Sequence, residues 1–535
     1  MVDSRTKERK SMTQQKSEDC IVPEAAGNRG KTWNTRTAKG GKAIPVERKG
    51  QQLNLKFAAA EKTRQRGTES RRGKDRFLSR LSKVRKAKGK MKRVGPARME
   101  EVIERLEEAF EEVAANKGAP GPDRQSVEYV RKHIHEILPE LRAALQGGNY
   151  RPGEIRRVWI PKAGGGQRGL GIPNVVDRVV QEAVRLVIEP VYEPTFHESN
   201  HGFRPNRGCQ TAIAEARRYV EEGYEWVVDF DLEKFFDRVH HQRLMGRLSQ
   251  RLKDKRLLAL IGRMLKAKVV MPDGVKVSTE EGVPQGGPLS PILSNIVLSE
   301  LDEELARRGH RFVRYADDSN IYVRSKRAGE RVMASVVSFI KRRLRLKVNE
   351  SKSAVARPET RHFLGYRLQP IKGGWAEVML SERSEKRLGE RIRELTPRTN
   401  GKSLKATITE VNGYLQGWVG HFGVCTPGIE WTIRRADAHI RRRMRAITLK
   451  HWKRKRTMAQ RLIRLGIKRK TAWRSVYDGR QSIWALSHSP AVDRGLRNAY
   501  FAERGFVSLW DRFQKIWAAI SAPVQASLPL GTLRS

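Results

Sequence analysis

Apolar positions first fall into a helical period near residue 100. Apolar side chains recur every three or four positions from Val102 to Val113, and Gly118 closes the pattern. This spacing predicts a helix with one buried face. Residues 174–188 carry a second, more strongly apolar pattern, which predicts a helix that ends before Pro190.

Strand patterns follow. Residues 156–160 and 170–172 flank a glycine-rich turn at 164–166, which predicts a hairpin. Helices and short strands then alternate to about residue 370, and beyond it the pattern is helical and basic. Residues 1–98 show no comparable period and are polar and basic, so we expect a flexible arm with at most one short helix there.

The charge of the chain narrows the choice of partners. Lys and Arg number 108 against 59 acids, which gives a net charge of +49 and a pI near 10.7. Such a charge favours polyanions and makes binding strongly dependent on salt. Composition alone leaves open an enzyme that acts on nucleic acid and a ribosomal-type or chromatin-type binder without chemistry.

Cysteine usage and hydropathy indicate the compartment. Cys20, Cys209 and Cys425 are too far apart for a disulfide framework or a paired-cysteine zinc site. No apolar stretch approaches the length of a membrane span, and the first residues lack the apolar core of a secretory signal. We therefore expect a cytoplasmic protein with reduced thiols and no membrane partner.

Acids interrupt one of the strand patterns. Residues 226–231 alternate as in a strand with one buried face, which places Asp229 and Asp231 together on the opposite face. Acids on an apolar strand are costly to bury unless they are paired or bound to metal. A solvated strand end that caps the next helix is the plain structural alternative.

A second predicted hairpin carries two more acids. Residues 311–323 read as strand, turn and strand with the tip at 316–319, so Asp317 and Asp318 project from the tip. A divalent cation would relieve the repulsion between adjacent carboxylates, although an ordinary turn is the alternative. Two Mg²⁺ ions about 3.5–4 Å apart, as in nucleotide polymerisation, need carboxylate oxygens from at least two strands. Asp231 and Asp317 meet that need if their strands are neighbours.

These segments resemble two motifs of reverse transcriptases. Tyr315-Ala-Asp-Asp318 is similar to the YADD box of that family, and residues 231–236 are similar to its motif A. The resemblance implies that Asp231, Asp317 and Asp318 form the catalytic, metal-binding triad. It also implies that Phe236 is the bulky residue that excludes a ribose 2′-hydroxyl, with plain core packing as the alternative.

Further segments resemble the same family in the expected order. Residues 160–173 resemble the fingers hairpin, in which Lys162 and Arg168 would hold the incoming triphosphate. The loop Gly282-Val-Pro-Gln-Gly-Gly-Pro-Leu-Ser290 would place Gln285 near the nucleotide, and residues 346–353 would offer Lys352 as a proton donor to pyrophosphate. Other matching blocks are 116–123, 201–208 and 363–366.

The C-terminal part is basic and rich in tryptophan. Sixteen Lys or Arg and one acid, Asp437, lie between residues 434 and 470. We expect contact with an RNA backbone, with most of the tryptophans in the helical core. Residues 415–422 and 451–454 resemble elements of group II intron maturases, and 475–505 resemble the DNA-binding region that follows. The cysteine pairs of the endonuclease domain found in many relatives are missing, so we expect no target cleavage by this chain.

The resemblance implies an α+β right-hand polymerase, with fingers and an antiparallel palm sheet, followed by an all-α thumb and maturase region. The expected parts are a basic arm (1–98), fingers (99–225), palm (226–370), thumb and maturase region (371–455) and DNA-binding region (456–535).

The implied function is RNA-directed DNA synthesis with two Mg²⁺ ions, together with binding of group II intron RNA and help in its splicing and mobility. The implied partners are intron RNA, an RNA template, a DNA primer, target DNA and deoxynucleoside triphosphates, and the oligomeric state is left open. Two alternatives stand beside this: an RNA-binding splicing factor without polymerase activity, and a domesticated reverse transcriptase in DNA repair or defence.

Overall fold

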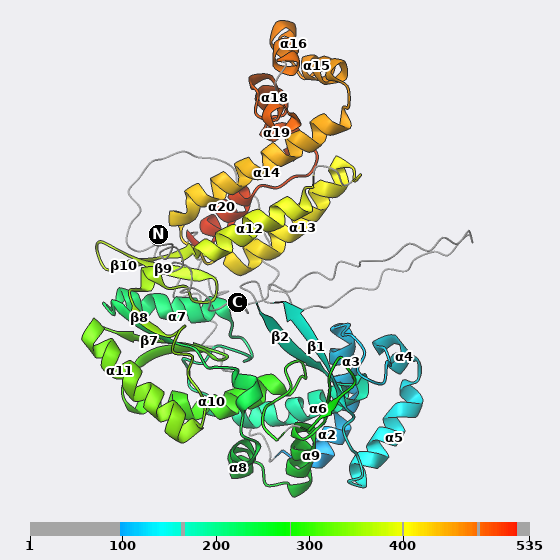
Figure 1. Ribbon diagram of the computed structural model, residues 1–535, viewed down its shortest axis with the longest axis vertical. Helices are drawn as coiled ribbons and strands as arrows, with labels where there is room; N and C mark the ends of the chain where they lie inside the picture. The colour runs from blue at the N-terminus through cyan, green and yellow to red at the C-terminus, as the bar shows by residue number, and fades with distance from the viewer. Residues whose placement is uncertain (1–96, 162–165, 279, 398–400, 479–481, 522–535) are drawn as a thin grey trace, which may run out of the picture.

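A computed structural model describes residues 97–161, 166–278, 280–397, 401–478 and 482–521 (Figure 1). The basic arm expected over residues 1–98 lies outside the described residues, apart from its last two positions. Helices and strands form a lower body, and a tower made of helices stands above it.

The fingers combine five helices with a small sheet. The helices are α2 (Met99–Glu104), α3 (Leu106–Ala115), α4 (Val127–Lys132), α5 (Ile134–Gln146) and α6 (Val175–Tyr192). The sheet has the order β2 (Gln167–Ile172), β1 (Ile155–Pro161), β4 (Val269–Val270) and β5 (Lys276–Val277). The expected hairpin is confirmed, because β1 and β2 pair antiparallel from Arg156–Ile172 to Pro161–Gln167.

One helix is longer than its sequence suggests. We expected the apolar helix at 174–188 to end before Pro190, but α6 continues through this proline to Tyr192. A proline breaks a helix mainly by removing one hydrogen bond and crowding the preceding turn. Pro190 lies so close to the end of α6 that the helix is already anchored by its long buried face, and the Glu193 N–H still donates to the Glu189 carbonyl.

The palm is a four-stranded antiparallel sheet. Its order is β6 (Arg311–Tyr315), β7 (Asp318–Val323), β3 (Trp226–Phe230) and β8 (Ala354–Ala356). The palm helices are α7 (Cys209–Glu221), α8 (His241–Arg251), α9 (Lys255–Leu265), α10 (Ser290–Arg307) and α11 (Lys326–Phe339). This arrangement confirms the expected antiparallel palm.

Both faces of the palm sheet are buried. Val228 and Phe230 of β3 belong to a core shared with α10, α11 and the fingers, whereas Val227 belongs to a core shared with α7 and the helices of the tower. Figure 1 shows α7 on one side of the sheet and α10 and α11 on the other. The expectation of one buried face for this strand is therefore wrong, since a second layer covers the face that carries Asp229, which is only 6% exposed.

The tower is helical but begins with a hairpin. Strands β9 (Tyr366–Ile371) and β10 (Trp375–Leu380) pair antiparallel across the boundary that we expected at residue 370, so the region beyond 370 is not wholly α. The helices after it are α12 (Glu382–Leu395), α13 (Leu404–Phe422), α14 (Glu430–His451), α15 (Lys455–Arg464), α16 (Arg469–Tyr477), α17 (Ile483–Leu486), α18 (Pro490–Gly495), α19 (Asn498–Ala502) and α20 (Leu509–Ser521).

The last helix returns to the base of the tower. Helix α20 packs against α13 and α14, and its Phe513 is fully buried in the same core as Trp418. The lone acid of the basic stretch explains this return, because Asp437 in α14 is buried and accepts hydrogen bonds from the N–H groups of Leu509 and Trp510 at 2.9 Å. A carboxylate at a helix N-terminus satisfies free N–H groups and complements the helix dipole.

Candidate active site

Two predicted carboxylate residues occupy neighbouring positions at one end of the two central strands of the palm sheet. Strands β3 and β7 pair as far as Phe230 and Ser319, so the next residues on the two strands are Asp231 and Asp318. The strands are therefore neighbours, as the sequence argument required. Within the described part of the chain, no three carboxylate, imidazole or thiol groups lie close enough together to hold a metal ion as their side chains stand. The donors present are nevertheless carboxylate oxygens, the type that Mg²⁺ prefers.

The hairpin that carries the other acid has a tighter turn than expected. Tyr315 pairs with Asp318, so the tip consists of Ala316 and Asp317 alone rather than residues 316–319. Ala316 has φ of 57°, in the left-handed region that L-residues adopt only in tight turns. Asp318 thus belongs to strand β7 and Asp317 to the turn.

A buried ion pair supports this tip from behind. The Arg314 guanidinium donates to both carboxylate oxygens of Asp302 in α10, at 2.7 and 2.5 Å, and to the carbonyl of Ala316 at 2.9 Å. Arg314 is 1% exposed and Asp302 is fully buried. This contact could not be foreseen from the sequence, because an arginine on a strand and an aspartate on a helix are each ordinary surface residues.

The block at 201–208 lies against the same hairpin. The His201 N–H donates to the Arg314 carbonyl, and the Arg314 N–H donates to the Ser199 carbonyl, both at 2.8 Å. A Cβ atom on Gly202 would lie 2.2 Å from the Ala316 nitrogen, so only glycine fits there. This block therefore fixes the outer edge of β6 and the approach to the tip.

Lys352 lies beside the first carboxylate. Its Nζ atom is 3.9 Å from Asp231 Oδ2, and the Asn349 N–H donates to the Asp231 carbonyl at 2.7 Å. Arg361 holds this loop, since it donates to the Lys352 carbonyl at 3.0 Å and forms an ion pair with Asp229. The sequence pattern marked Asp229 as an acid that needs a partner, but it could not identify one so far along the chain.

The fingers join the palm through a glycine-rich loop. The Val283 N–H donates to the carbonyl of Phe236, and the Gly171 N–H of β2 donates to the carbonyl of Gln285, both at 2.6 Å. Gly286 has φ of 125°, and a Cβ atom there would lie 2.4 Å from the Gly171 oxygen. Phe236, Gln285 and strand β2 are thereby brought close together.

The structure describes some, but not all, of the remaining predicted nucleotide-binding residues. Arg168 is half-buried in β2 opposite Ile160, and Lys162 lies outside the described residues. Phe236 is half-buried and meets Phe235 edge to face, with ring centroids 5.2 Å apart. Its position is compatible with the predicted exclusion of a 2′-hydroxyl and with packing against the palm core.

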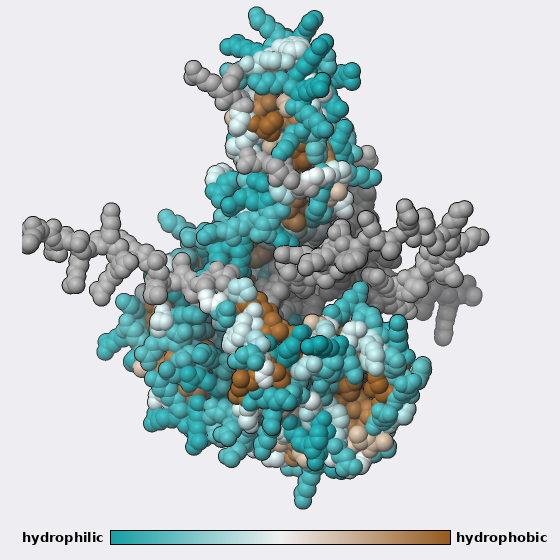
Figure 2. Space-filling model, turned by 45° about the vertical axis from the view of Figure 1, so that its right-hand side comes forward, coloured by the Kyte–Doolittle hydropathy of each residue, from teal (hydrophilic) through white to brown (hydrophobic). Residues whose placement is uncertain are grey.

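The basic surface of the tower carries a mixed set of tryptophans. Trp418 and Trp452 are buried, as expected for core residues, whereas Trp431 is 68% exposed on α14. Arg435 lies over the Trp431 ring at 5.0 Å, and Arg434 lies over the Trp510 ring at 3.8 Å. Figure 2 shows that the visible face of the tower is mostly hydrophilic with small apolar patches.

Two known families match successive parts of this chain. Residues 160–368 match the family described as "Reverse transcriptase (RNA-dependent DNA polymerase)", and residues 385–466 match the "Group II intron, maturase-specific domain". The chain contains a reverse transcriptase domain followed by a group II intron maturase domain. The first match contains all eight predicted site residues.

This chain resembles several known proteins over part of their length. It is 39% identical over 209 residues to Protein YkfC of Escherichia coli, which covers 38% of this chain and 55% of YkfC. It is 29% identical over 335 residues to the group II intron-encoded protein LtrA of Lactococcus lactis, which covers 50% of this chain and 55% of LtrA. The chain thus spans about 55% of the length of these relatives.

Among solved structures, a chain of the "Partial Cas6-RT-Cas1--Cas2 complex" matches this reverse transcriptase at 22% identity with a TM-score of 0.30. That match covers 46% of this chain and 42% of the other, and it is too weak for a comparison of architecture. None of the helices in the described ranges combines the length and hydropathy that a bilayer-spanning segment needs.

Proposed function

We propose that this chain synthesises DNA on an RNA template and also binds group II intron RNA and assists its splicing. The sheet register carries the first part of this proposal, because it brings Asp231 of one strand beside Asp318 of the next, with Asp317 in the adjoining turn. The maturase match beyond residue 385 supports the second part. We place this activity in the bacterial cytoplasm, at the nucleoid when target DNA is bound.

The three aspartates would hold two Mg²⁺ ions. Bound in this way, the metal would lower the pKa of the primer 3′-hydroxyl and stabilise the charge on the triphosphate. Lys352 would donate a proton from Nζ to the leaving pyrophosphate, since it already lies 3.9 Å from Asp231 and its loop is held by Arg361.

The other site residues would bind and select the nucleotide. Lys162 and Arg168 would hold the triphosphate as a point charge and a bidentate donor. The Phe236 ring would exclude a 2′-hydroxyl, and Gln285 would lie near the new base pair, on a loop anchored to β2 by the hydrogen bond from Gly171.

Primer extension tests the polymerase proposal. A DNA primer on an RNA template should be extended in Mg²⁺ by the full chain, and Asp317→Ala should lower the rate by at least about 100-fold because one charged ligand is lost. Asp237→Ala, which removes an exposed carboxylate just beyond motif A, is the matched control and should keep the rate. A folded wild-type protein that extends no primer on several templates would favour an RNA-binding splicing factor instead.

Splicing of a group II intron transcript tests the maturase proposal separately. The full chain should accelerate splicing at low Mg²⁺, and Asp317→Ala should keep this effect, because the RNA-binding surface does not depend on the catalytic aspartates. Polymerase activity without any effect on splicing would favour a domesticated reverse transcriptase.

A further inference from the structure

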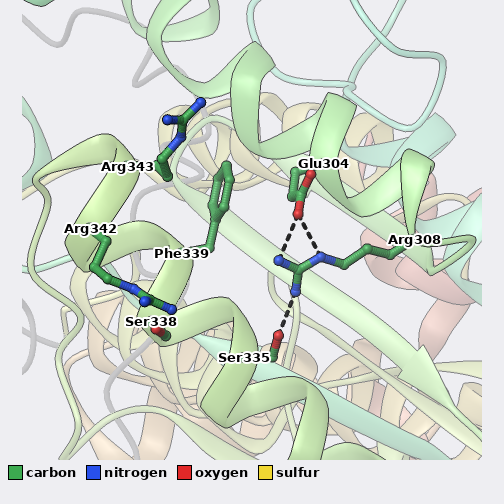
Figure 3. Close-up of a pocket in the computed structure, with 7 residues that line it drawn as sticks. All are labelled: Glu304, Arg308, Ser335, Ser338, Phe339, Arg342 and Arg343. Carbon is green, nitrogen blue, oxygen red and sulfur yellow. Dashed lines mark hydrogen bonds and ion pairs between the residues drawn. The ribbon is translucent and has the colours of Figure 1, made fainter.

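A basic cavity lies on the palm, between the C-terminal ends of α10 and α11. It has a volume of about 610 Å³, and its lining includes Glu304 and Arg308 from α10, Ser335 and Phe339 from α11, and Arg342 and Arg343 just beyond α11. Figure 3 shows the Phe339 ring between the Glu304–Arg308 pair and the two later arginines. The cavity therefore combines guanidinium groups, a hydroxyl and an aromatic ring.

One wall of the cavity is already neutralised and fixed. Arg307 and Arg308 both donate to Glu304, and these bonds lower the pKa of the Glu304 carboxyl to about 2. Arg308 also donates to the Ser335 hydroxyl oxygen at 2.6 Å, as Figure 3 shows. This wall ties α10 to α11 and leaves little of the Arg308 charge uncompensated.

The opposite wall carries uncompensated charge. Arg342 and Arg343 are exposed, and neither side chain forms a hydrogen bond or ion pair with any residue that the structure describes. They lie in the π-helical turn η3 (Ile340–Leu344), whose end residues Ile340 and Leu344 are buried and fix it to the core. Such turns are rare and recur at functional sites.

The cavity lies far from the loop that contains Gln285. Helix α10 starts at the loop that contains Gln285, since the Ser290 hydroxyl donates to the Pro284 carbonyl at 2.6 Å. Glu304 lies fourteen residues further along this helix, or roughly 20 Å at about 1.5 Å per residue. A ligand in the cavity therefore lies outside the cleft that would hold primer and nucleotide.

We propose that this cavity binds backbone phosphates of intron RNA at a point away from the copied strand. The inference rests on the proposed function, which supplies a large folded RNA as a partner. Arg342 and Arg343 offer planar donors that match phosphate oxygens, and Arg308, which lies over the Phe339 ring at 5.8 Å, adds a third guanidinium group to the cavity. Free nucleotides share the phosphate chemistry, and the test below separates them from RNA.

The test compares two double variants of the full chain. Arg342→Ala/Arg343→Ala removes the unpaired charge from the cavity, and Arg327→Ala/Arg331→Ala removes the same charge from exposed positions of α11 outside it. Binding to a folded group II intron transcript is measured between 50 and 300 mM KCl by filter retention. The same proteins are assayed for primer extension, for binding to duplex DNA, and for thermal stability with and without a deoxynucleoside monophosphate.

The cavity variant should bind the transcript at least about fivefold more weakly, with its log–log salt slope smaller by about 2. The control should bind nearly as the wild type does, and both should extend primers normally. An equal loss in the control, an unchanged affinity of the cavity variant, a matching loss on duplex DNA, or nucleotide stabilisation that disappears only in the cavity variant would each overturn the inference. A wild-type protein that does not bind the transcript would overturn the proposed splicing function as well.

Discussion

At the scale of single residues, the hairpin that carries Asp317 and Asp318 is held by a charged pair that water does not reach. Arg314 and Asp302 satisfy each other through two hydrogen bonds, and the arginine uses a third donor for the carbonyl of Ala316. Burying two charges is costly, so their main effect is to fix one geometry of the tip rather than to add stability.

Replacement of one member of the Arg314–Asp302 pair should therefore destabilise the protein more than replacement of both. Arg314→Met leaves the Asp302 carboxylate buried without its cation, and we expect the free energy of unfolding to fall by about 3–5 kcal/mol. Arg314→Met/Asp302→Leu should recover most of this loss while primer extension stays impaired, because the Ala316 carbonyl has lost its donor. Urea denaturation of the wild type and the two variants measures the difference, and equal stability of both variants would contradict the argument.

At the scale of elements, the loop with Gln285 approaches strand β2 as closely as two backbones can. The hydrogen bond between Gly171 and Gln285 requires that residue 286 have no Cβ atom, because this atom would lie 2.4 Å from the Gly171 oxygen. The contact connects strand β2 of the fingers, which carries Arg168, to the palm.

Gly286→Ala should separate these two elements. We expect an increase of roughly tenfold in KM for the nucleotide and a smaller fall in kcat, because the loop must move to relieve the clash. Gly274→Ala is the matched control, since Gly274 also has positive φ, of 87°, but nothing lies within 4 Å of its added Cβ. Steady-state primer extension gives both constants, and similar effects of the two substitutions would show that backbone strain alone is responsible.

The hydropathy pattern and the order of the motifs predicted which helices and strands form better than they predicted the contacts between these elements. The β1–β2 hairpin was predictable because a turn and two short strands are set by neighbouring residues. The single buried face expected for 226–231 was wrong, since hydropathy cannot tell that α7 and the core it shares with the tower cover the second face of β3. The Asp231–Asp318 proximity followed from family resemblance, whereas the Asp229–Arg361 contact could not be foreseen because it joins positions 132 residues apart.

At the scale of the whole molecule, two cores meet at the palm sheet. One core contains the fingers and the lower palm helices, and the other runs from α7 through β9 and β10 to α20. His421 at the end of α13 lies against the second core, where its ring stacks on the buried Tyr366 of β9 and its carbonyl accepts from the Tyr366 hydroxyl at 2.6 Å. The first hairpin of the tower and its helix α13 thus share a titratable contact.

Mildly acid pH should weaken the contact between His421 and Tyr366. Burial lowers the pKa of His421 below its usual value of 6.5, so the folded protein favours the neutral ring. The stability that depends on this neutral ring is present above pH 6.5 and is lost as the pH falls toward the lowered pKa of the folded state. Thermal unfolding at pH 7.5 and 5.5 should show a smaller difference for His421→Gln than for the wild type. His135→Gln, at an exposed position, should behave as the wild type does.

The position of β3 in the sheet has a consequence for synthesis of the protein. Its neighbours β7 and β8 are encoded later, so this strand leaves the ribosome before either edge can be paired. At about 5–20 residues per second, the chain from Phe230 to the end of β7 at Val323 takes roughly 5–19 s to make. For that interval each nascent chain carries an apolar strand with two open edges, which on a crowded polysome can pair with the same strand of the next chain. Chaperone supply and translation speed, rather than the stability of the finished fold, should therefore limit the yield of active enzyme.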